Sequence, residues 1–96
     1  MGEVAPESIR EERAPAGVTL LFFAAARQAA GVAKESVDAA TLAEVLDGAR
    51  RRHGEAFTAI LEGCRVWVNG EPAEEATALR DGDEVAVLPP VSGGYG

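Results

Sequence analysis

Six consecutive apolar or β-branched residues, VTLLFF at positions 18–23, constrain the fold of this chain more than any other segment. Such a run is typical of a β-strand. Successive strand residues point to opposite faces of a sheet, so a run this apolar predicts a central strand covered by helix on at least one face. We therefore expect a domain in which a sheet with this strand near its centre packs against helix.

The helix that would cover the sheet is predicted from about Thr41 to His53. Thr41 followed three residues later by Glu44 forms a capping-box pattern at its start. Apolar residues then recur at helical spacing, at Leu42, Val45, Leu46 and Ala49, which gives the helix one apolar face. Arginines at 50–52 suit the negative end of the helix dipole, and Gly54 is expected to end the helix.

The other segments predict short elements. These are a helix at 24–30 ending at Gly31, a strand at 34–39, a helical turn at 56–61 closed by Gly63, and strands at 65–69 and 84–88, with a tight turn at Asn69-Gly70. This order predicts an α+β domain with one mixed sheet packed on one main helix. We expect that domain at 18–90, a flexible extension at 1–17 and a flexible tail at 91–96.

Charge and cysteine content exclude several classes of protein. The chain has 16 acidic and 9 basic residues, a formal net charge of −7, which argues against binding to nucleic acid or to an anionic membrane surface. A single cysteine excludes an internal disulfide. No apolar run approaches the roughly 20 residues of a membrane span, and residues 1–17 lack a signal-peptide core, so we expect a cytoplasmic protein.

Side chains that could carry catalysis are few. His53 follows three arginines and is expected at the surface of a helix end, and Cys64 is expected to be a half-buried cysteine at a strand, although Arg65 beside it could lower its pKa. Asp81, Asp83 and Glu84 lie close together, but their spacing fits a turn and not a calcium loop. We therefore expect no metal site and no catalytic side chain.

The end of the sequence has a more specific pattern. Pro89-Pro90 stops the last strand, and Val91-Ser92-Gly93-Gly94 continues as a narrow backbone that could enter another protein's site. The stretch 79–94, LRDGDEVAVLPPVSGG, closely resembles the end of the small subunit of molybdopterin synthase, the MoaD family. The segment LFFAAAR at 21–27 resembles the start of that family, and the similarity extends over about residues 18–94.

This resemblance implies a ubiquitin-like β-grasp fold and the role of a sulfur carrier, as in the MoaD and ThiS proteins. In that family an E1-like (MoeB-like) enzyme uses ATP to adenylate the carboxylate of the last glycine, here Gly94, which is then converted to a thiocarboxylate. The tail next enters the large, MoaE-like synthase subunit, which uses the sulfur for the molybdenum cofactor. The carrier itself holds no cofactor and needs no catalytic side chain.

The sequence differs from the family at its end, because Tyr95 and Gly96 follow Gly94. A tyrosine ring would not fit a channel sized for glycine, so we expect both residues to be removed, for instance by a JAMM-type metalloprotease. Two other readings stay open at this point: Gly96 is the acceptor, or this copy is inactive.

The resemblance and the apolar strands also predict a docking surface beside the tail. It would include Phe22 or Phe23, of which only one can face the core, together with Leu88, Pro89, Pro90 and Val91. Two alternative functions remain: a sulfur carrier for another biosynthetic pathway, and a ubiquitin-like modifier whose tail is joined to lysines of other proteins.

Overall fold

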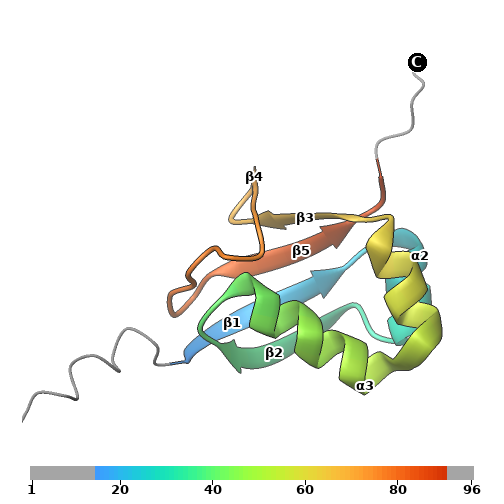
Figure 1. The fold of residues 1–96 in the computed structure, drawn as a ribbon, viewed down its shortest axis with the longest axis horizontal. Coiled ribbons are helices and arrows are strands. Elements are labelled where there is room, and N and C mark those ends of the chain that lie inside the picture. The colour runs from blue at the N-terminus through green and yellow to red at the C-terminus, as the bar shows by residue number, and fades with distance from the viewer. Residues whose placement is uncertain (1–14, 91–96) are drawn as a thin grey trace, which may run out of the picture.

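The computed structural model describes residues 15–90 and has a five-stranded mixed sheet with a long helix across one face and a short helix at one end of the strands (Figure 1). The elements in chain order are β1 (Ala16–Phe22), α2 (Ala24–Ala30), β2 (Lys34–Ala39), α3 (Leu42–Glu62), β3 (Arg65–Val68), β4 (Glu71–Pro72) and β5 (Glu84–Leu88). The strand order across the sheet is β2-β1-β5-β3-β4. The predicted α+β architecture is therefore confirmed.

The first strand lies inside the sheet, as its apolar sequence predicts. β1 pairs antiparallel with β2 on one side and parallel with β5 on the other, and Leu20 lies opposite Val85. β5 pairs antiparallel with β3 on its far side. Because β1 and β5 run in the same direction, both end at the same edge of the sheet, and we call this edge the tail edge.

The start of β1 differs from the prediction. The strand begins at Ala16, inside the segment expected to be a flexible extension. The backbone N–H of Gly17 donates a 2.7 Å hydrogen bond to Asp81 Oδ1, and the Gly82 N–H donates a 2.8 Å bond to the Gly17 carbonyl. These bonds come from a loop more than sixty residues away, so the local composition of the sequence could not show them.

The main helix begins at its predicted cap. The Glu44 N–H donates to Thr41 Oγ1 at 3.3 Å, and the Glu44 carboxylate accepts from the Ala40 N–H at 2.8 Å, one residue before the usual capping-box partner. Gly54 has φ 86° and ψ −169°, a non-helical conformation that glycine adopts readily, and it divides α3 into two segments. The predicted end at Gly54 and the further helical segment before Gly63 are both confirmed.

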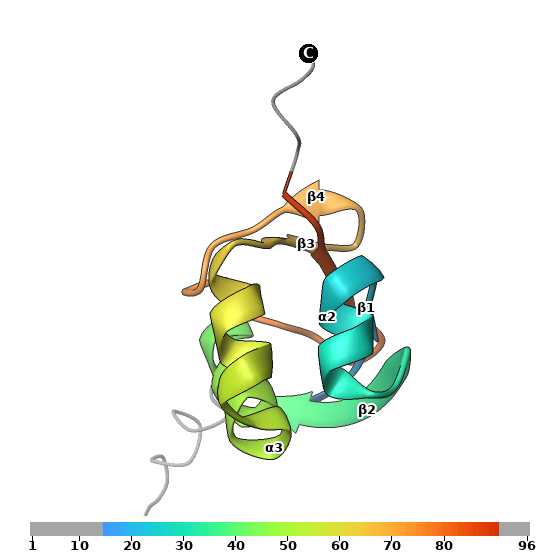
Figure 2. The same ribbon diagram turned by 90° about the vertical axis from the view of Figure 1, so that its right-hand side faces the viewer.

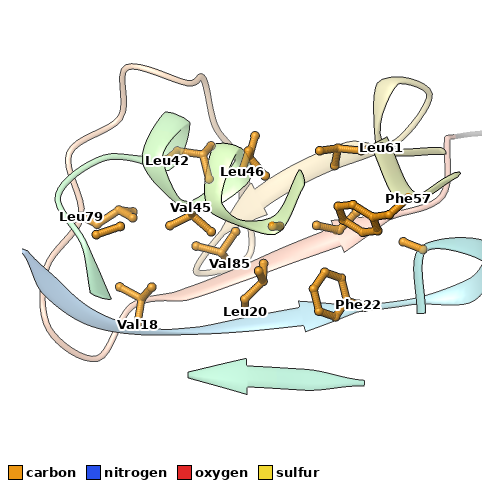
Figure 3. Packing of buried hydrophobic residues seen from close by; sticks show 14 of the residues in the cluster. Val18, Leu20, Phe22, Leu42, Val45, Leu46, Phe57, Leu61, Leu79 and Val85 are labelled. Atoms are coloured by element: carbon orange, nitrogen blue, oxygen red, sulfur yellow. The ribbon is translucent and has the colours of Figure 1, made fainter. Parts of the chain in front are cut away.

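The hydrophobic core lies between the sheet and α3 (Figure 3). Val18, Leu20 and Phe22 of β1 point toward the helix, where Leu42, Val45 and Leu46 of the first segment and Phe57 and Leu61 of the second meet them. The predicted apolar helix face is thus the buried one. α2 packs beside the second segment of α3 near the tail edge (Figure 2).

The hairpin from β3 to β4 is closed by the predicted Asn-Gly turn. Asn69 and Gly70 have φ values of 51° and 84°, the positive values that a two-residue type I′ turn requires. Within residues 15–90, neither helix combines the length and apolar character that crossing a membrane requires.

Candidate functional site

The tail edge is where the predicted functional segment leaves the sheet. β5 ends at Leu88, and Pro89 and Pro90 follow it as exposed residues that have no backbone N–H for strand pairing. The remaining predicted residues, Val91, Ser92, Gly93, Gly94, Tyr95 and Gly96, lie outside the described residues. The structure therefore shows the platform from which this segment starts.

Phe22 and Phe23, both predicted as candidates for partner binding, lie in different environments. Phe22 is 1% exposed in the core, so of the two alternatives it is not the one that faces a partner. Phe23 is 42% exposed; it directly follows β1 and is the N-cap of α2. Of the two phenylalanines, only Phe23 is accessible to a partner.

Phe23 borders an apolar cavity of about 270 Å³ at the base of the segment that follows Pro90. The cavity is lined by Phe23, Ala24, Ala25, Ala26, Ile60, Gly63, Cys64, Pro89 and Pro90. None of these residues carries a charge, so a partner's side chain would meet an uncharged wall there. The structure thus brings predicted Phe23, Pro89 and Pro90 together.

The sheet face turned away from α3, which we call the outer face, carries apolar side chains next to the tail edge. The strand register places Leu21 opposite Ala86, Ala86 opposite Trp67, and Trp67 opposite Pro72, so these four form a row across the sheet. Leu88 lies on the same face, one step closer to the tail edge. We call these five residues the apolar half of the outer face. The alternation in EVAVL and RVWV is the signal that could have identified Ala86 and Trp67 as its members.

His53 differs from the sequence-based prediction of a surface residue. Its side chain is only 12% exposed, and its ring lies 5.5 Å from Phe22 and 5.3 Å from Phe57, measured between ring centroids. Its Nε2 lies 2.8 Å from Glu35 Oε2. Arg52 also donates to Glu35, at 2.6 Å. His53 and Arg52 therefore tie α3 to β2, and the ring of His53 closes one end of the core.

Electrostatics at Glu35 fit this structural role. Burial by itself would raise the pKa of Glu35, but the hydrogen bond and charge of Arg52, with smaller contributions from His53, hold it below the usual 4.5. Glu35 is therefore an anion that two neighbours stabilise.

Cys64 is half-buried, as predicted, and its thiol donates to the Ile60 carbonyl at 3.2 Å. Burial raises the pKa of this thiol, so the suggestion that Arg65 could lower it is wrong. A thiol with a raised pKa is a poor nucleophile near neutral pH.

The acidic residues near β5 form a turn, as predicted. Asp81 accepts from the Gly17 N–H, and Asp83 accepts from Asn69 Nδ2 at 2.9 Å and from the Arg80 N–H at 2.8 Å. The hydrogen bond from Asn69, followed by that from Arg80, lowers the pKa of Asp83. Across residues 15–90, no three His, Cys, Asp or Glu side chains come together as a metal site would need.

Comparison with known proteins bears on this arrangement. Residues 20–94 match the model of the ThiS family. The molybdopterin synthase sulfur carrier subunit of Chlamydomonas reinhardtii is 34% identical over 82 residues, which cover 80% of this chain and 98% of that protein.

Solved structures share the fold. A putative molybdopterin converting factor subunit 1 from Pyrococcus furiosus superposes with a TM-score of 0.71 and 30% identity, covering 79% of this chain and 99% of that one. SAMP1 of Haloferax volcanii, a small archaeal modifier protein, gives 0.70 and 31% over 81% and 99%. Subunits 1 and 2 of the Helicobacter pylori molybdopterin-converting factor form a complex, and a chain of that structure gives 0.64 and 26% over 81% and 99%.

These neighbours have the ubiquitin-like β-grasp fold, so the implied fold is confirmed. The sequence match covers most of the described domain and the curated relatives align over nearly their whole length. This chain belongs to the ThiS family of sulfur carrier proteins that also includes MoaD.

Proposed function

We propose that this protein is the sulfur carrier subunit of a molybdopterin synthase and carries sulfur as a thiocarboxylate on Gly94. The observation that carries the proposal is the place where the family match stops. The match runs through the last strand and both prolines to Gly94, the second glycine of Ser92-Gly93-Gly94, and excludes Tyr95. The relatives that bear this name support the choice of pathway.

The chemistry requires only a free carboxylate on Gly94 and partner enzymes. An E1-like enzyme joins this carboxylate to the α-phosphate of ATP and releases pyrophosphate. A sulfur donor then displaces AMP and leaves a thiocarboxylate, whose sulfur is nucleophilic. The large synthase subunit transfers that sulfur to the pterin precursor.

The carrier's own contribution is to hold the start of the tail in a fixed position. Pro89 and Pro90 continue from β5, which is paired on both sides by β1 and β3. A segment attached to such a strand starts from a fixed point, and a fixed starting point favours productive approach in the partner's site. Glycines at 93 and 94 keep the segment narrow.

Tyr95 and Gly96 make a processing step part of the proposal. While Tyr95 is attached, Gly94 has a peptide bond in place of a carboxylate, so it cannot be adenylated. A protease of the JAMM type that cuts after Gly94 would create the reactive group.

The test compares chains ending at Gly94 and at Gly96, each incubated with the E1-like enzyme, ATP and a sulfur source. Intact mass detects replacement of one oxygen by sulfur. We expect conversion of the chain ending at Gly94 only. A third chain, which ends at Gly94 and carries Gly93→Tyr, is the control for the effect of a wide side chain in the tail. Equal conversion of the chain ending at Gly96 would contradict the processing step, and conversion of neither chain would contradict the carrier function.

Docking on the large subunit is the second part of the proposal. The apolar half of the outer face ends at Leu88, and the cavity at Phe23 is lined by Pro89 and Pro90, so a subunit that admits the segment after Pro90 would cover both. The complex of the Helicobacter pylori subunits supports such an assembly.

Phe23→Asp tests this docking, because it places a charge on the cavity rim without entering the core. Ala76→Asp is the control that adds the same charge, since Ala76 is exposed and its neighbours Glu75 and Thr77 accept hydrogen bonds from the start of α3, away from the tail edge. We expect Phe23→Asp to abolish the complex on gel filtration and Ala76→Asp to preserve it. Retention of the complex by both variants would place the interface elsewhere.

Conjugation to other proteins is a second candidate function, favoured by the likeness to SAMP1. It predicts that the chain ending at Gly94 forms isopeptide adducts with lysines of other proteins in the presence of ATP and the E1-like enzyme. Free thiocarboxylate without such adducts favours the sulfur carrier.

A further inference from the structure

The apolar half of the outer face is bordered by two cations. Lys34 pairs with Leu21 and so extends the row of Leu21, Ala86 and Trp67 at its β2 end. Arg65 pairs with Leu88 at the tail edge. Both are exposed. The side of the outer face closest to the tail edge therefore combines apolar contact area with positive charge.

The other side of the same face is polar and acidic. Two residues farther from the tail edge than the pair of Leu21 and Lys34, Thr19 lies opposite Ser36. Thr19 also lies opposite Glu84 on its other side. Asp38 follows Ser36 by two positions on β2 and lies on the same face. We call Ser36, Thr19, Glu84 and Asp38 the far half. Asp38 and Glu84 are exposed, and no lysine or arginine occupies the far half.

Charged side chains on the helix side form ion pairs with one another, whereas those on the outer face do not within the described residues. On the helix side, Arg50 forms a 2.7 Å ion pair with Asp47 and Arg52 forms a 2.6 Å pair with Glu35. Among residues 15–90, no carboxylate lies within 4.0 Å of Lys34 or Arg65, and no cation lies that close to Asp38 or Glu84. Within the described residues these four charges therefore have no ion-pair partner.

We propose that this division of charge sets the orientation in which the large subunit docks. The proposal rests on the proposed function and adds the chemistry of the partner surface. That surface would have carboxylates beside an apolar patch at the entrance of its channel, facing Lys34 and Arg65. Basic side chains would lie about 7–13 Å from these carboxylates, because the two halves of the outer face are two to four strand residues apart. Turning the carrier by half a turn on that surface would bring like charges together. Only one orientation satisfies both halves, and it directs the segment after Pro90 toward the channel.

Physical estimates support a kinetic role for these charges. The chain has a net charge of −7, and the carboxylates of the far half favour a basic surface of the partner. Lys34 and Arg65 are the cations beside the apolar half, so the two halves of the outer face differ in charge. Separations of about 7–13 Å are comparable to the screening length of about 8 Å at physiological ionic strength. Complementary patches of this kind raise association rates by about 10- to 1,000-fold, and salt removes the effect.

Charge reversal on each half tests the proposal. One variant combines Lys34→Glu with Arg65→Glu, and the other combines Asp38→Lys with Glu84→Lys. The matched control combines Arg51→Glu with Glu55→Lys on α3, where both side chains are exposed and away from the outer face. Association with the purified large subunit of the same organism is followed by stopped flow at about 20 and 500 mM salt, and thermal melts verify that each variant is folded.

At low salt we expect each outer-face variant to associate at least about 10-fold more slowly than the wild type, and we expect the difference to fall below about 2-fold at high salt. The control should stay within about 2-fold throughout. Reversed charges on the partner's channel entrance should restore the rate of the Lys34→Glu, Arg65→Glu variant.

Failure of this proposal can be distinguished from failure of the proposed function. If the wild type binds and both outer-face variants bind at its rate at low salt, the charge-orientation proposal is wrong and the carrier function stands. If the wild type does not bind the large subunit under any salt condition, both proposals are wrong.

Discussion

The adjacent residues Phe22 and Phe23 give the sharpest test of the structure, because truncating them should have opposite consequences. Phe22 is 1% exposed, and its ring meets those of His53 and Phe57 edge-on, each at a centroid distance of 5.5 Å. Phe22→Ala leaves a cavity among these rings. We expect it to lower the free energy of unfolding by about 3–5 kcal/mol, of which about 0.5–1.5 kcal/mol for each lost aromatic pair is a part.

Phe23→Ala removes the same number of atoms from a site that is 42% exposed. It leaves no enclosed cavity, and the loss of partly buried area should cost about 1 kcal/mol. Binding to the large subunit should weaken in this variant, whose fold stays intact.

Urea unfolding followed by far-UV circular dichroism measures both free energies, and an unchanged m-value shows that the unfolding reaction is the same. With about 4–8 °C per kcal/mol for a domain of this size, Phe22→Ala should lower Tm by at least about 12 °C. Phe22→Leu keeps a large apolar side chain and should cost less than Phe22→Ala, so it keeps the comparison measurable if the alanine variant does not fold. Equal losses at positions 22 and 23, or a larger loss at 23, would refute the assignment of the two faces.

Three further variants test separate parts of the fold. Leu46→Ala truncates the buried face of α3 and should cost about 2–5 kcal/mol in a urea melt; an unchanged midpoint would mean that this face is misplaced. Gly70→Ala forces a side chain into a turn position with φ 84° and should cost about 1 kcal/mol, whereas the same change at Gly48, inside the helix, should not destabilise through φ. Glu35→Gln removes a carboxyl whose lowered pKa stabilises the fold above about pH 4.5, and that stabilisation is lost as the pH falls through the lowered value. The variant should therefore be less stable than wild type at about pH 7, and the deficit should shrink as the pH falls through the lowered pKa of Glu35. A deficit that persists in acid would show that packing, not charge, is responsible.

The local elements of the fold could be predicted because their signals lie in neighbouring residues. The capping box at Thr41, the spacing from Leu42 to Ala49, the Asn69-Gly70 turn and the alternation of β5 all act over a few positions. The end of the first helical segment at Gly54 could be predicted for the same reason, since one glycine creates the break in α3.

Features that the sequence did not reveal depend on contacts between distant segments. β1 starts at Ala16 because the loop at Asp81 and Gly82 bonds to Gly17. His53 is partly buried because Glu35, eighteen residues earlier, bonds to it and because Phe22 lies beside its ring. The choice between Phe22 and Phe23 could not be made from an unbroken apolar run, because such a run has no alternation to assign the faces.

The position of Trp67 gives the protein a spectroscopic reporter of its own. Trp67 is the single tryptophan of the chain, and it is half-buried in the middle of the row that joins Leu21, Ala86 and Pro72. Its indole emission depends on the water around it, so covering the outer face should shift the emission to shorter wavelength, while unfolding should shift it to longer wavelength. With a large subunit whose own tryptophans have been replaced by phenylalanine, the emission wavelength of Trp67 can distinguish docked, free and unfolded carrier without a label.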